Sequence, residues 1–234
     1  MKIYTIKYYF YGSDQIVPKN YEELLLHFLH PIILGENNEY HDKTSLYSVS
    51  QLYNSTKTTN TGFLFNKGAI WKIRTPSLEV FKDFYLKSKN HIGKELGCGL
   101  FLKSVDFYKE EIIGLNSITI GTTPIFLGQN ENSDKPDHIT YKHNELSTKK
   151  MKSVFMTKSH KLGYYISEDD FNIEFDHNSP LRITPIPFKG GLNFSTKGNI
   201  VITGSSDVIG LCYGFGIGLC TGSGFGCCFD IKIK

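Results

Sequence analysis

The sequence predicts an α+β fold in which antiparallel sheets carry helices on one face. Strand-like and helix-like segments follow one another over residues 1–108 in the order β-α-β-β-α-β, which is the ferredoxin-like (RRM-like) arrangement. The second half mixes strands and helices again, without a convincing sequence repeat of the first. A break in the pattern at residues 110–116 separates the halves. We therefore expect two tandem ferredoxin-like domains, at residues 1–113 and 114–234.

Hydrophobic periodicity predicts the first strand and the first helix. Lys2–Phe10 alternates polar and apolar residues, as a half-buried strand does. Asn20, with Glu23 three residues later, has the spacing of a helix cap before the segment YEELLLHFLH. Pro31 lacks a backbone N–H, so it should end or kink this helix. The apolar face of the helix is formed by Leu24, Leu25, Phe28 and Ile32.

The other elements are predicted in the same way. Residues 46–52 and 62–74 have the composition of strands, and a turn-like segment joins them. Ser77 should cap an amphipathic helix over Leu78–Lys89, and a strand should follow at residues 100–108. In the second half we expect a strand at residues 117–128, a basic helix at 144–160, and strands at 171–175, 181–188, 192–194 and 199–203.

Residues 208–229 form an uncharged segment that contains seven glycines. The segment is long enough for a transmembrane helix, but so much glycine makes a poor helix. A dinucleotide loop is not indicated, because Thr221 stands where the third glycine of Gly-x-Gly-x-x-Gly belongs, and the P-loop pattern fails at Ser88. The remaining interpretation is a short helix that begins at Asp207, followed by a glycine loop and a final strand at residues 226–234. The glycines serve either phosphate contact or tight packing.

Composition restricts the class of protein only broadly. The net charge of +3 is a weak indication of nucleic-acid binding. Four of the five cysteines lie in one segment, and the odd count argues against a disulfide framework and for a reducing compartment. The N-terminal segment lacks the apolar core of a signal peptide. We expect a cytoplasmic protein.

Several motifs occur in the order found in one known family. Gly216-Ile-Gly218 is followed after five residues by Gly224-Phe225-Gly226. His41 precedes the strand-like residues 46–52. Thr123-Pro124-Ile125 and Phe188-Lys189-Gly190 come later in the chain. Over nearly its whole length the chain thus resembles the CRISPR-associated endoribonucleases of the RAMP superfamily, which cut precursor CRISPR RNA within each repeat.

This resemblance implies a reaction that needs neither a metal nor another cofactor. The ribose 2′-OH attacks the adjacent phosphodiester, which leaves a 2′,3′-cyclic phosphate and a 5′-OH. His41 is then the first candidate for proton transfer, His27 is the second, and His30 competes with His27. Lys43 is a near substitute for the family's lysine and could neutralise the developing charge. Glu23, His27 and His30 also have a spacing compatible with metal ligands, but a complete ligand set is not evident.

The expected partner is CRISPR repeat RNA. RNA phosphates would contact the loop glycines Gly216, Gly218, Gly224 and Gly226 together with Lys149, Lys150 and Lys189. Lys149 and Lys150 belong to a basic run that also contains Lys142, His143, Lys152, Lys158, His160 and Lys161, and a solvated helix face explains this run equally well.

The chain departs from the family in one further respect, because residues 219–223 contain none of the basic residues usual in the glycine loop. This departure favours the alternative of a non-catalytic RNA-binding subunit of an interference complex. Contacts with other subunits of such a complex, and a monomer or a homodimer, all remain open, whereas no membrane partner is expected.

Overall fold

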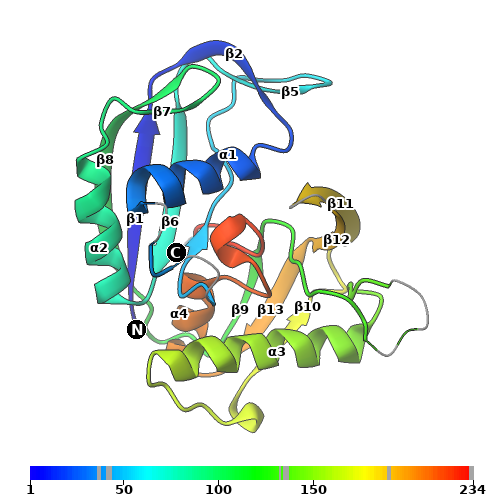
Figure 1. The fold of residues 1–234 in the computed structure, drawn as a ribbon. Coiled ribbons are helices and arrows are strands. Elements are labelled where there is room, and N and C mark those ends of the chain that lie inside the picture. Colours follow the sequence, from blue (N-terminus) through cyan, green and yellow to red (C-terminus); the bar gives the residue numbers. More distant parts are fainter. Residues whose placement is uncertain (36–37, 41–43, 132, 134–136, 189–190, 232–234) are drawn as a thin grey trace.

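The computed structural model describes residues 1–35, 38–40, 44–131, 133, 137–188 and 191–231, and its sheets are antiparallel throughout this part of the chain. The first half forms a sheet with helices on one face, and the second half forms a smaller sheet beside a long helix (Figure 1). The α+β class with antiparallel sheets is therefore confirmed.

The larger sheet has the strand order β3-β6-β1-β8-β7. Alternation along β1 turns Ile6, Tyr8 and Phe10 into the core beneath the helices, where the rings of Tyr8 and Trp71 lie 5.1 Å apart. A second sheet, of order β2-β5-β4, extends beyond it. The strands are Lys2–Phe10 (β1), Ser13–Pro18 (β2), Ser48–Val49 (β3), Lys57–Thr58 (β4), Gly62–Phe65 (β5), Ala69–Thr75 (β6), Glu95–Gly97 (β7) and Leu100–Glu111 (β8).

The first helix differs from its prediction at both ends. It begins as α1 (Glu22–His27) with Tyr21 at the N-cap and no side-chain capping bond, so the predicted cap at Asn20 is wrong. The buried Tyr21 hydroxyl instead accepts a hydrogen bond from the backbone N–H of Leu52. Pro31 does not end the helix, because the chain continues as a π-helix, η1 (Phe28–Leu34). The wider turn relieves the contact between the proline ring and the preceding turn.

The second helix, α2 (Leu78–Lys89), confirms its prediction: Ser77 accepts from the N–H of Val80, and Val80, Phe81 and Phe84 are buried. The predicted strands around it are partly wrong. Of residues 46–52 only Ser48–Val49 pairs with β6 as a strand. The pairing stops there because the N–H of Lys72 donates to the Ser50 hydroxyl and not to a backbone carbonyl of this segment. Residues 62–74 are broken by a turn at Gly68, whose φ is +97°.

The second half contains a three-stranded sheet of order β10-β13-β9 and a separate β11–β12 hairpin. Figure 1 shows α3 running along the base of the molecule, with α4 above it. The elements are β9 (Ser117–Gly121), α3 (Asn144–Lys161), η2 (Glu168–Asp170), β10 (Asn172–Phe175), β11 (Arg182–Phe188), β12 (Gly191–Lys197), β13 (Asn199–Thr203), α4 (Ser206–Phe215) and η3 (Thr221–Ser223).

Two strand predictions in the second half are wrong. The strand predicted over 117–128 stops at Gly121, after which the chain makes only single bridges, such as Phe126 with Leu219. Residues 226–231 of the predicted final strand form no strand. Their contacts with β9 and the residues after it include a Thr122–Cys228 bridge and a hydrogen bond from the Phe229 N–H to the Gly121 carbonyl. Among the described residues, no helix is both long and apolar enough to cross a bilayer.

Two hydrophobic cores hold the chain together. The first joins β1, β6 and β8 to α1, η1 and α2, and the second joins α3 and α4 to the sheet of β9, β10 and β13. Ile3 at the start of β1 and Ile112 after β8 belong to the second core. The first strand therefore ties the halves together, and the segment after α4 lies against both.

Candidate functional site

A cleft of about 550 Å³ lies between the first helix and the segment after α4. Its walls come from α1 and η1, from the residues just before β3, from α3, and from residues 218–223. In Figure 1 these are the blue helix and the red loop that faces it, above α3. The polar or titratable side chains that line it are His27, His30, Tyr40, Thr44, Ser45, Tyr47, Lys158, Cys220, Thr221 and Ser223. No Asp or Glu of the described residues is among its lining, so the cleft suits an anion.

His30 lies within a chain of hydrogen bonds in this cleft. Its Nδ1 is 3.3 Å from Asn38 Oδ1, and its Nε2 is 3.3 Å from the hydroxyl of Tyr47. The orientation of the Asn38 amide is fixed, because its Nδ2 donates to the Gly35 carbonyl and its Oδ1 accepts the Tyr40 N–H. An oxygen facing Nδ1 requires the proton on that nitrogen. Neutral His30 therefore presents an Nε2 lone pair to the Tyr47 hydroxyl.

Tyr47 is held rigidly for this contact. Its side chain is 1% exposed, and its ring packs edge-on against Phe84 with centroids 4.9 Å apart. Burial raises the pKa of the Tyr47 phenol well above its ordinary value. The phenol therefore keeps its proton over the range in which histidines titrate, and it can donate to Nε2.

The other predicted catalytic residues have different placements. His27, the last residue of α1, is exposed and lines the same cleft. His41 and Lys43 lie outside the described residues. Glu23, His27 and His30 do not come together as a metal-ligating group in the part of the chain that the structure describes.

Packing explains three of the four predicted RNA-binding glycines without a ligand. A Cβ at Gly226 would lie 1.7 Å from the Ile217 carbonyl oxygen, and one at Gly218 would lie 2.7 Å from that of Phe126. At Gly216 the same atom would approach the Gly226 carbonyl oxygen to 2.8 Å. All three have positive φ angles, which favour glycine independently.

The loop also contains glycines with a different environment. Gly224 has a φ of +92°, but a Cβ there would make only ordinary van der Waals contacts, with the side chains of Glu22 at 3.6 Å and Val49 at 4.0 Å. Gly222 packs directly onto the cleft residues, since a Cβ would lie 2.6 Å from Ser45 Oγ and 2.9 Å from the Tyr47 hydroxyl. In the described part of the chain the backbone amides of Gly218 and Gly222 donate to no protein acceptor, which leaves donors available for an anion.

Of the predicted lysines that the structure describes, only Lys158 lines the cleft. The alternative of a solvated helix face does not hold for Lys158, because its side chain is 3% exposed. Lys149 is exposed, and Lys150 is half-buried two turns before Lys158 on the same side of α3. Lys189 lies outside the described residues.

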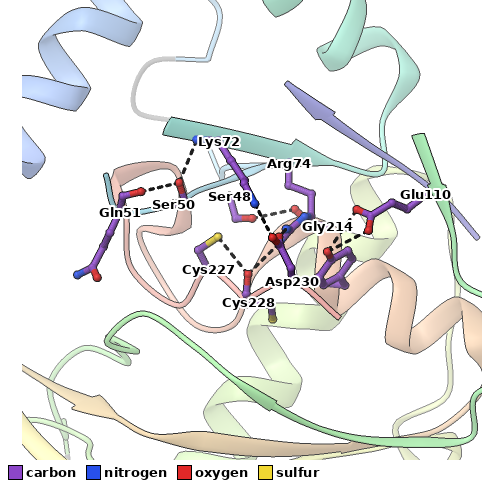
Figure 2. Close-up of polar contacts among 11 residues, drawn as sticks. Ser48, Ser50, Gln51, Lys72, Arg74, Glu110, Gly214, Cys227, Cys228 and Asp230 are labelled. Atoms are coloured by element: carbon purple, nitrogen blue, oxygen red, sulfur yellow. Dashed lines mark hydrogen bonds and ion pairs between the residues drawn. The ribbon is translucent and has the colours of Figure 1, made fainter. Parts of the chain in front are cut away.

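A second polar cluster anchors the segment that follows the glycine loop (Figure 2). The Arg74 guanidinium donates to the Cys228 carbonyl at 2.8 Å and to the Asp230 carboxylate at 2.9 Å, and it stacks on the Tyr213 ring at 3.8 Å. Burial raises the pKa of the Asp230 carboxyl, but the hydrogen bond from Lys72 and the nearby charges outweigh it, so this pKa lies below its ordinary value. The cluster ties the C-terminal segment to β6.

The whole chain is similar in structure to several solved proteins. A structure described as "CRISPR associated protein Cas6" has a TM-score of 0.75 at 16% identity and covers 98% of this chain and 100% of that one. A Cas6-related protein from Pyrococcus furiosus has a TM-score of 0.75 at 20% identity over 100% and 99%. "An RAMP protein binding different RNA substrates" has a TM-score of 0.74 at 18% identity over 99% and 100%.

The fold is that of the Cas6 and RAMP proteins. The resemblance drawn from the motifs is thus confirmed at the level of structure and over the full chain. No protein-family model matches the sequence, and no curated protein matches it.

Sequence reasoning did not identify two residues of this cleft as members of the site. Tyr47 was treated only as part of a strand, and nothing in the local sequence indicates its contact with His30. Lys158 had a detectable signal, because it falls on the stripe of α3 that buries Met151 and Phe155.

Proposed function

We propose that this protein is a metal-independent endoribonuclease that cuts precursor CRISPR RNA within the repeat. The observation that carries the proposal is the cleft itself. It combines two histidines, a buried tyrosine and a glycine loop with unused amides, and no carboxylate of the described residues lines it. An RNA phosphate fits this set of donors, and histidines can move the protons.

The proposed reaction uses the RNA's own 2′-OH as the nucleophile. A neutral histidine takes the 2′-OH proton, and the oxygen attacks the adjacent phosphorus. A second proton donor then protonates the 5′-oxygen as it leaves, which gives a 2′,3′-cyclic phosphate and a 5′-OH. Loop amides would stabilise the charge on the phosphorane. Holding the scissile step in line supplies much of the remaining acceleration.

The proposed assignment of roles keeps His41 as the first proton-transfer residue, with Lys43 near the developing charge. Its partner is His27 or His30. The hydrogen-bonded chain from Asn38 through His30 to Tyr47 supports His30, because it fixes the tautomer and orientation of that ring. The exposure of His27 within the cleft supports a role closer to solvent, such as protonation of the leaving oxygen.

We further propose that the halves are tandem ferredoxin-like domains, at residues 1–113 and 114–234. The support is the order β8-β1-β6-β3 within the larger sheet, together with the two separate cores. In this arrangement the cleft lies where the second domain's glycine loop meets the first domain's helix.

The experiment uses repeat RNA from the CRISPR array of the source organism, with excess EDTA. We expect one cut, and we expect His30→Ala and His41→Ala each to slow it by roughly 10²-fold with little change in affinity. His27→Ala should have a smaller effect of the same kind. Activity abolished by EDTA and restored by magnesium or zinc would contradict the metal-independent mechanism.

The second candidate function is a non-catalytic RNA-binding subunit of an interference complex. The absence of Lys and Arg from residues 219–223 favours it, as does the structural likeness to a protein described as binding different RNA substrates. Tight repeat binding with no cleavage by the wild-type protein would identify this function.

A further inference from the structure

Lys158 has an environment that is unusual for a lysine. Its side chain is 3% exposed, and it rises from α3 beneath the glycine loop. Its Nζ lies 2.9 Å from Thr221 Oγ1, 3.3 Å from the Gly218 carbonyl oxygen and 3.4 Å from the Phe215 carbonyl oxygen. An ammonium group has three protons, and these contacts account for all of them.

These contacts join three separate segments. The Phe215 carbonyl ends α4, where a cation interacts favourably with the helix dipole. Gly218 and Thr221 lie in the loop that forms one wall of the cleft. The Thr221 hydroxyl also donates a hydrogen bond to the Tyr47 carbonyl, at 2.9 Å. Lys158 is thus linked through one hydroxyl to the residue that contacts His30.

Among the described residues, no carboxylate forms an ion pair with Lys158. The described partners of Nζ are two carbonyls and one hydroxyl. Burial lowers the pKa of its ammonium group to about 7, although the thiols of Cys212, Cys220 and Cys228 oppose this shift. The other titratable groups of the described cleft wall are Tyr40, Tyr47, His27 and His30. None of them supplies a negative charge at neutral pH.

We propose that Lys158 is a positioning residue of the RNA-cleavage site, which holds the glycine loop against Tyr47 and supplies beneath the loop the positive charge that an RNA phosphate requires. The proposal rests on the proposed function, and it accounts for the missing basic residue of the loop. The cation comes from α3, about sixty residues earlier in the chain, rather than from residues 219–223.

Such a charge couples RNA binding to proton uptake. A phosphate above the loop stabilises the protonated form, so the pKa of Lys158 rises in the complex. Above the pKa of the free protein, binding must then take up a proton. The association constant should fall as the pH increases, by up to about tenfold per pH unit. Binding is therefore compared between pH 7.5 and 9.5, and the Lys158→Met variant shows how much of the pH dependence comes from the other groups of the cleft.

The experiment measures the binding of repeat RNA that carries 2′-deoxyribose at the cut, so that cleavage cannot interfere. Titration calorimetry at pH 8, in buffers of different ionisation enthalpy, should show the uptake of a fraction of one proton by the wild type. Lys158→Met should show no uptake and a nearly flat pH dependence, whereas Lys158→Arg should restore affinity without that pH dependence. Lys57→Met is the matched control, because Lys57 is exposed on β4 and lines no part of the cleft.

The outcomes separate this inference from the proposed function. A wild-type protein that binds and cuts repeat RNA without proton uptake at pH 8 would overturn the role of Lys158 and leave the nuclease in place. The same conclusion follows if Lys158→Met retains the wild-type pH dependence. A wild-type protein without affinity for repeat RNA would overturn both. Because proton uptake is measured on the wild type, the test stands even if Lys158→Met does not fold.

Discussion

The stability of the RNA-free protein should depend on pH through Lys158. Its pKa is about 7 in the folded protein and 10.5 in an exposed lysine. Between these values the unfolded chain binds more protons than the folded one, so the free energy of unfolding rises with pH. The difference between the two pKa values corresponds to at most about 5 kcal/mol. The folded protein is destabilised by this full amount below pH 7, and the destabilisation disappears as the pH increases to about 10.

Lys158→Met removes this cost together with the hydrogen bonds of the side chain. Leaving Thr221 Oγ1 and two buried carbonyls without their donor should cost about 1–3 kcal/mol at any pH. The variant should therefore be as stable as the wild type, or more stable, at pH 6, and less stable at pH 10. Between pH 7 and 10 the difference should change by at most about 1.4 kcal/mol per pH unit.

The assay is urea denaturation followed by circular dichroism, at intervals of half a pH unit, for the wild type, Lys158→Met and Lys57→Met. The difference between wild type and Lys57→Met should not change with pH in this range, since Lys57 is exposed. Parallel curves for the wild type and Lys158→Met would show that Lys158 titrates normally, and the assignment of a buried, uncompensated charge would then be wrong.

Three further results are expected at the site. Tyr47→Phe should slow cleavage by about tenfold and shift the pH profile of the reaction, since it removes the hydroxyl that contacts His30 Nε2. An unchanged pH profile would make Tyr47 a packing residue only. Gly222→Ala should weaken RNA binding, because its Cβ would lie 2.9 Å from the Tyr47 hydroxyl, and circular dichroism should show that the variant still folds. A folded variant with wild-type affinity would mean that the loop is not part of the RNA site. Lys149→Ala combined with Lys150→Ala should reduce the slope of log affinity against log salt by about two, and an unchanged slope would exclude these lysines from phosphate contact.

Much of the fold is visible in local sequence patterns. Lys2–Phe10, Leu78–Lys89 and Asn199–Thr203 have the bounds that alternation, capping and helical period predict. Failures occur where distant residues decide. The final strand fails because Arg74 and Lys72, far back in the chain, hold the C-terminal segment through its carbonyl and carboxylate groups.

The candidate site was only partly predictable. Glycine spacing located the loop, and helical spacing placed His27 and His30 on one face of the first helix, but their position beside the loop was not predicted. The same spacing could not distinguish phosphate contact from packing, and packing accounts for Gly216, Gly218 and Gly226. The tertiary contacts that define Tyr47 and Lys158 join residues 17 to 63 positions apart. No local pattern encodes such contacts, so the cation beneath the loop could be found only in three dimensions.

The most direct test of the account is the chemistry of the cut ends. Repeat RNA is incubated with the wild-type protein in excess EDTA, and the fragments are analysed by mass spectrometry. The account predicts an upstream fragment that ends in a 2′,3′-cyclic phosphate, a downstream fragment with a 5′-OH, and no cut when the nucleophilic ribose is 2′-deoxy. A 3′-OH with a 5′-phosphate, or cleavage of the 2′-deoxy substrate, would contradict the mechanism.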